Sequence, residues 1–111
     1  MIPNTVSAIG RYAFYGCSEL EYIMLPDSVS SILECAFHSC SKLEKIVLGS
    51  GLESVGDFAF VNCKGLKTIF NNSKLILHIG SNEYGSIASN ATYIYSVGQW
   101  EFVEGIPMPK E

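Results

Sequence analysis

The sequence predicts a solenoid, a right-handed superhelix in which short parallel strands alternate with return segments that hold one turn of α- or 3-10 helix. Three observations predict it. One pattern of residues returns every 23 positions, it does so three times without an insertion, and it fades after residue 70. A unit this short cannot bury its apolar side alone, so copies must stack, and each repeated position then forms a ladder through the core.

The three copies span residues 2–24, 25–47 and 48–70, and together they make a repeat domain predicted over residues 1–70. They read IPNTVSAIGRYAFYGCSELEYIM, LPDSVSSILECAFHSCSKLEKIV and LGSGLESVGDFAFVNCKGLKTIF. Five aliphatic columns keep their character in all copies, and Ala, Phe and Cys recur unchanged. These last columns are Ala13, Ala36 and Ala59; Phe14, Phe37 and Phe60; Cys17, Cys40 and Cys63. Eight ladders are therefore expected.

The strand of each copy is expected near its end, where apolar and variable residues alternate. From the end of the first copy into the second, the alternation directs three side chains inward, namely Leu20, Ile23 and Leu25. Tyr22 and Met24 then point outward, onto the concave face. Pro26 closes the strand where its missing N–H does least harm. A second short extended stretch is predicted over residues 6–9.

The return segment carries the Ala-Phe pair, with Ala at the close approach of neighbouring coils and Phe in a stacked interior spine. The residue before each repeat cysteine is Gly16, Ser39 or Asn62. Gly and Asn tolerate left-handed backbone, so this position predicts a turn.

The motif Ile/Leu-Pro-x-x-Val-x-x-Ile-Gly-x-x-Ala-Phe-x-x-Cys-x-x-Leu-x-x-Ile closely resembles the BspA-like leucine-rich repeat. The resemblance covers residues 2–70, and it departs where Gly49-Ser50-Gly51 replaces Pro-x-x and where Leu33 replaces Gly. It implies a leucine-rich-repeat solenoid and a non-enzymatic protein of the cell surface or a secreted one, mostly bacterial, that adheres to host proteins, matrix or other cells. Binding residues are not fixed in this family, so none is carried over.

The last third of the chain predicts a β-containing cap over residues 71–103, because terminal repeats must be atypical to close a stack. Residues 74–80 are expected to add one edge strand. Residues 93–97 and 100–103 are expected to pair as a hairpin through Gly98-Gln99. The tail, residues 104–111, carries Pro107 and Pro109 and is predicted to be flexible.

The cysteines are the first candidates for chemistry, and the repeat accounts for three of the four as a buried ladder of thiols. Cys35 lies just before an Ala-Phe pair and is expected to pack as well. His38 lies two residues from Cys40, but a cysteine that faces inward lacks the geometry of an activated thiolate. His78 is isolated. No CxxC pair occurs, so neither catalysis, metal binding nor a cofactor is predicted.

Composition limits the partners. With 7 Lys+Arg and a net charge of -4, the chain lacks the clustered cations that neutralise phosphates, so nucleic acid is not an expected partner. Membrane insertion is not expected either, because no apolar run reaches the ~18–20 residues of a span.

The concave face is the candidate site. Its outward columns are Tyr22-Lys45-Thr68 and Met24-Val47-Phe70. The second column is wholly apolar where a solvent-facing sheet position is usually polar. It either marks a partner site or lies beneath a cap residue such as Trp100 or Tyr93.

Three functions follow from this reading. The leading one is a protein-interaction or adhesion module, a fragment of a longer chain that binds a host or matrix protein. The alternatives are a structural spacer and a carbohydrate-binding module that uses Tyr22, Tyr93, Tyr95 and Trp100. The chain also opens partway through a unit, so an apolar edge is expected at its N-terminal end, where self-association would follow.

Overall fold

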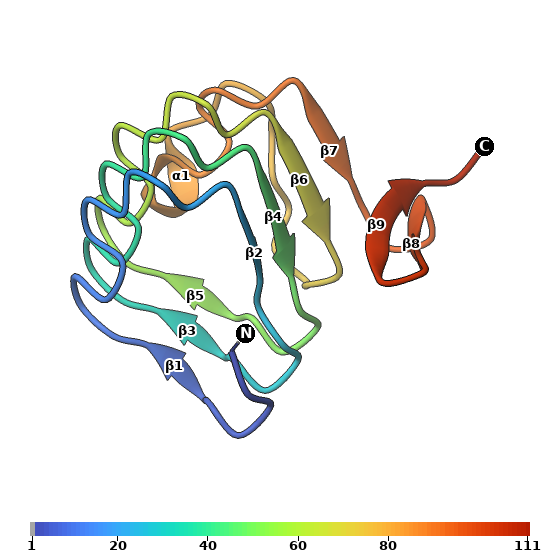
Figure 1. Ribbon diagram of the computed structural model, residues 1–111, viewed down its shortest axis with the longest axis horizontal. Helices are drawn as coiled ribbons and strands as arrows, with labels where there is room; N and C mark the ends of the chain where they lie inside the picture. The colour runs from blue at the N-terminus through green and yellow to red at the C-terminus, as the bar shows by residue number, and fades with distance from the viewer. Residues whose placement is uncertain (1) are drawn as a thin grey trace.

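The computed structural model describes residues 2–111 as a stack of coils with a hairpin beside it (Figure 1). One sheet has four parallel strands in the order β2 (Tyr22–Met24), β4 (Lys45–Leu48), β6 (Thr68–Asn71) and β7 (Tyr93–Tyr95). A second sheet has three parallel strands, β1 (Ala8–Ile9), β3 (Ser31–Ile32) and β5 (Ser54–Val55). The antiparallel hairpin consists of β8 (Trp100–Val103) and β9 (Ile106–Pro109). These elements form a repeat solenoid of short parallel strands.

Strand register follows the 23-residue period. Tyr22 pairs with Lys45 and Lys45 with Thr68, and in the second sheet Ser31 pairs with Ala8 and Ser54. Each step moves the chain by one copy of the repeat, so equivalent residues lie directly above one another. The predicted strand of each copy and the second extended stretch are therefore both present.

Stacked side chains fill the interior as the ladders predict. The rings of Phe14 and Phe37 lie 5.0 Å apart at 1°, and those of Phe37 and Phe60 lie 5.1 Å apart at 9°. Phe37 and Phe60 are fully buried, and Leu25 and Ile23 also point inward. Burial of these columns is the main source of stability, because no single coil can bury them alone.

The return segments differ from the prediction, since residues 11–16, 34–39 and 57–62 form consecutive turns rather than a turn of helix. The backbone φ is positive at Tyr12, Cys35 and Phe58 as well as at the predicted left-handed positions, Gly16, Ser39 and Asn62. Two left-handed residues per coil break the helical hydrogen-bond ladder. Alternate N–H groups then reach the next coil, as the N–H of Phe14 does when it donates to the carbonyl of Ala36 at 2.7 Å.

Residues 72–95 make a fourth, irregular coil, in which β7 continues the first sheet. Thr68 pairs with Tyr93, which is 25 residues further on rather than 23. The described residues 74–80 contain no strand, so the expected edge strand is not formed there. In this coil α1 (Glu83–Ser86), one short and distorted turn, stands where the earlier coils have the Ala-Phe turn. The carbonyl of Gly85 accepts from the N–H of Phe60 at 2.8 Å, as the carbonyl of Ala59 does from the N–H of Phe37.

The C-terminal strands pair differently from the prediction. The strand near residue 93 joins β6, and β8 pairs with β9, which occupies part of the segment expected to be flexible. Glu104 and Gly105 both have positive φ and form the tight turn of a hairpin. Every second residue of such a strand points its N–H away from the partner. Pro107 and Pro109 take those positions, whereas the N–H of Lys110 donates to Gln99 at 2.9 Å, so the prolines do not prevent pairing.

Candidate functional site

The outer face of the four-stranded sheet carries both predicted columns. Register brings Tyr22, Lys45 and Thr68 into one row, which Tyr93 of β7 extends; we call these four residues the exposed ladder. Tyr22 is 39% exposed and Tyr93 55%, Lys45 is exposed and Thr68 is half-buried. Burial also raises the pKa of the Tyr22 phenol, so its hydroxyl stays protonated and able to donate a hydrogen bond.

The second column behaves differently. Met24, Val47 and Phe70 also lie in one row, which Tyr95 extends; we call these four residues the covered ladder. Val47 is 3% exposed and Phe70 2%, while Met24 and Tyr95 are half-buried. The sequence left two explanations for this apolar column, a partner site or cover by a cap residue. In the structure a cap residue covers it.

Trp100 is that cover. Its indole packs on Phe70, with ring centroids 5.3 Å apart, and on the hairpin residue Phe102 at 5.1 Å, while Tyr95 stacks on Phe70 at 5.4 Å. Trp100 is only 5% exposed, and its buried Nε1–H has no hydrogen-bond partner among the described residues. An unpaired buried donor is unfavourable, so it is the area of the ring that holds the hairpin on the sheet.

The repeat cysteines line the core of the stack as a ladder of thiols. Cys40 and Cys63 are buried, and their thiols donate to the carbonyl oxygens of Phe14 and Phe37 at 3.0 Å. The neighbouring Cys40 thiol and then burial raise the pKa of the Cys63 thiol, so it stays protonated. The neighbouring Cys63 thiol in turn lowers the pKa of Cys40. Cys35 is buried as well, and all four cysteines are free thiols. These thiols contribute to packing and to hydrogen bonds between coils.

The histidines lie outside the core. His38 stacks on Tyr15 with ring centroids 4.9 Å apart, and its Nδ1 lies 2.8 Å from the hydroxyl of Ser39. His78 is exposed. Within residues 2–111 no group of three or more His, Cys, Asp or Glu side chains is arranged to hold a metal ion.

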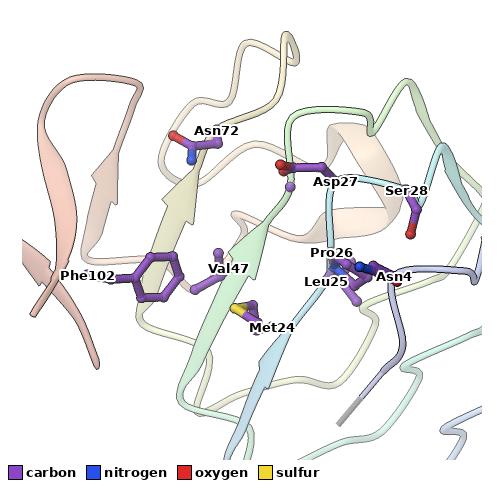
Figure 2. A pocket seen from close by; sticks show the side chains of 10 residues that line it. Asn4, Met24, Leu25, Pro26, Asp27, Ser28, Val47, Asn72 and Phe102 are labelled. Carbon is purple, nitrogen blue, oxygen red and sulfur yellow. The ribbon is translucent and has the colours of Figure 1, made fainter. Parts of the chain in front are cut away.

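Beside the contact that Trp100 makes, two hollows lie between the hairpin and the sheet. One, of about 260 Å³, lies beside the exposed ladder and is lined by Tyr22, Lys45, Ile106, Pro107 and their neighbours. The other, of about 620 Å³, lies at the carboxyl ends of β2 and β4, with Phe102 of the hairpin on one side and Asp27 on the other (Figure 2). Both are open to solvent and combine polar with apolar groups, as ligand sites do.

Parallel coils in register, apolar ladders inside and varied residues outside define a repeat solenoid. Over residues 1–99 the chain matches the family model for the BspA type leucine rich repeat region (6 copies). The chain therefore belongs to the BspA-type leucine-rich-repeat family, as the motif indicates. No curated protein and no solved structure shows significant similarity to it.

The family supports a coarse assignment of function. Leucine-rich repeats of this type are protein-interaction modules and are generally not enzymes, and their proteins are typically at the cell surface or secreted. Residues 2–111 contain no helix with the length and hydrophobicity of a membrane span.

Sequence reasoning did not place Tyr93 and Tyr95 on the two ladders, because two extra residues in the fourth coil take them out of the 23-residue alignment. The alternation of Tyr93-Ile94-Tyr95, with an aliphatic residue between two outward ones, is the signal that matches the earlier strands.

Proposed function

We propose that this chain is a non-enzymatic protein-interaction module that binds its partner through the exposed ladder, Tyr22, Lys45, Thr68 and Tyr93. One observation carries the proposal. The hairpin covers the neighbouring apolar ladder, and this row remains accessible beside it.

The chemistry of the row suits protein recognition. Tyrosines bury a large ring and still offer a hydroxyl, and they are enriched among the residues that dominate binding energy. Tyr22 and Tyr93 stand at the two ends of the row and Lys45 lies between them. The hollow of about 260 Å³ beside Tyr22 and Lys45 is large enough to admit a partner side chain.

The remaining predicted residues support this surface without forming it. Val47 and Phe70 anchor the hairpin, and Met24 borders the larger hollow. The partner is a protein of a host or of an extracellular matrix, and the parent protein is an adhesin at the cell surface or secreted. Family membership supports this context.

The two alternative functions, a structural spacer and a carbohydrate-binding module, would require different surface residues. A spacer needs no partner, so substitutions on the exposed ladder would change nothing. Carbohydrate binding by surface aromatics would rely on Tyr22, Tyr93, Tyr95 and Trp100, but Trp100 is buried and Tyr95 half-buried. Protein recognition by the exposed ladder needs neither of them.

The test is surface plasmon resonance of the chain over a panel of purified extracellular-matrix proteins. Tyr93→Ala should weaken the binding that is found by about tenfold or more, the loss typical of a tyrosine that contributes strongly to an interface. Tyr15→Ala is the matched control, since Tyr15 is 51% exposed on the return side. A panel without binding, or equal losses in the two variants, would refute the proposal.

A further inference from the structure

The larger hollow lies between the four-stranded sheet and the C-terminal hairpin. Its apolar side is formed by Met24 and Val47 of the sheet and by Phe102 of the hairpin, whose ring faces Val47 (Figure 2). Its polar side comes from turns next to the strands: Asn4 lies before β1, Asp27 and Ser28 follow β2, and Asn72 follows β6. None of the ten lining residues carries a positive charge.

The polar groups have free hydrogen-bond capacity. One oxygen of Asp27 accepts from the N–H of Ser50 at 2.7 Å, which fixes the carboxylate and leaves its second oxygen open. The hydroxyl of Ser28 donates to the carbonyl of Val6 at 2.7 Å, so its oxygen can only accept from a ligand. No side-chain hydrogen bond within residues 2–111 engages the amides of Asn4 or Asn72, each of which both donates and accepts.

This set of groups restricts the chemistry of a ligand. An anion would meet the carboxylate of Asp27 with no cation to offset it. A wholly apolar ligand would leave the carboxylate and two amides desolvated and unpaired, which is unfavourable. The ligand that satisfies the site offers several hydroxyl groups, which donate to Asp27 and Ser28 and exchange hydrogen bonds with the amides, and an apolar ring face.

From these constraints we infer that the hollow binds an uncharged sugar, with its hydroxyls on Asp27 and the two amides and its C–H face on Phe102. The volume of about 620 Å³ lies within the range of small-ligand sites. Phe102 is 44% exposed, and Trp100 holds it in place at 5.1 Å. The docked hairpin thus completes the site, which shares no residue with the exposed ladder.

The experiment starts from an array of uncharged, sialylated and sulfated glycans. Isothermal titration calorimetry with the methyl glycoside of the strongest uncharged binder then compares variants. Asp27→Asn keeps an acceptor for Ser50 and removes the charge, and it should weaken binding about tenfold, since hydrogen bonds to charged groups are about twice as strong as neutral ones. Phe102→Ala should weaken it by a similar factor. Asp57→Asn, an exposed acid on the third coil, is the control and should bind as wild type.

Further experiments distinguish a glycan on a protein from a soluble sugar, and the hollow from the exposed ladder. A glycoprotein that binds before but not after enzymatic deglycosylation shows that the chain takes a glycan on protein, and binding of the free methyl glycoside alone shows that it takes a soluble sugar. Tyr93→Ala should leave sugar binding unchanged even where it abolishes protein binding. An array without uncharged ligands, a preference for sulfated or sialylated glycans, or equal losses in Asp27→Asn and Asp57→Asn would overturn the inference.

Discussion

Replacing Trp100 by alanine should release the hairpin from the sheet. Trp100 is 5% exposed and covers Val47 and Phe70, and truncating a buried tryptophan costs about 3–5 kcal/mol. Because β8 and β9 form a separate two-stranded sheet, we expect the lost stability to appear as local opening of the hairpin, with the coils still folded.

Replacing Trp100 by phenylalanine should have a far smaller effect. The smaller ring gives up roughly 50 Å² of buried apolar area, which at about 25 cal/mol/Å² is about 1 kcal/mol. The change also removes the buried Nε1–H that has no partner among the described residues, which returns about 1–3 kcal/mol. The two effects sum to between zero and about 2 kcal/mol in favour of the variant, so Trp100→Phe should be as stable as wild type or slightly more stable.

Amide hydrogen exchange measures both variants. In Trp100→Ala the amides of β8 and β9 should lose their protection while those of β4 keep theirs, and a dye specific for exposed apolar surface should bind. In Trp100→Phe the protection should remain. Retained protection in the alanine variant would mean that other contacts hold the hairpin. An equally large loss in both variants would show that the indole N–H makes a favourable interaction.

Three further predictions concern the coils. Phe37→Ala should lower the free energy of unfolding by about 3–5 kcal/mol in urea titrations followed by circular dichroism, and Phe14→Ala, at the half-buried end of the stack, by clearly less; equal losses would contradict the stacked spine. The raised pKa of Cys63 keeps its thiol neutral in the folded chain, so above about pH 9, where the unfolded state releases a proton first, Cys63 contributes a loss of stability as pH rises; Cys63→Ser should lessen that fall, and an unchanged pH profile would exclude this cause. Leu20 and Phe14 line a mainly apolar hollow on the first coil, and light scattering at high concentration should show self-association that Leu20→Lys reduces, whereas a strictly monomeric wild type would refute it.

The coils could be predicted because every inward position recurs in all three copies of the repeat. A single alternation such as Leu20-x-x-Ile23-x-Leu25 is ambiguous by itself. Three copies in phase set the register, and the register then decides which side chains meet. The outward directions of Tyr22 and Met24 follow from the same alternation, so the candidate face was accessible to sequence reasoning as well.

The return turns and the C-terminal strands could not be predicted in the same way. Tyr12, Cys35 and Phe58 adopt positive φ, yet none of these residue types signals it. At these positions the backbone bonds to the next coil, as the N–H of Cys35 does when it donates to the carbonyl of Asp57 at 3.1 Å, and a single coil of the sequence does not reveal that contact. The strand at residue 93 had two candidate partners, β6 and the segment beginning at Trp100. The open edge of β6 is the nearer one, because the fourth coil follows the first three.

Whether the covered ladder is exposed to solvent depends on the contact between Trp100 and Phe70, which lie far apart in the sequence. Phe70 looks the same in the sequence whether solvent or Trp100 lies above it. The strand β9 in the C-terminal tail could not be predicted for a different reason, since its two prolines argue against a strand. Only the hairpin register shows that they stand where no N–H is needed.

The contrast between inward and outward positions bears on where recognition resides. At the middle of the three strands the inward residue is isoleucine each time, in Ile23, Ile46 and Ile69. One residue earlier the outward positions hold a phenol, an ammonium group and a hydroxyl. Folding requires the first column to stay constant, because each isoleucine packs on the next. It places no such demand on the second column, so its chemistry is free to match a ligand. A spacer would gain nothing from a large aromatic, a cation and a polar residue in one accessible row, whereas a binding surface would use that variety to distinguish its partner.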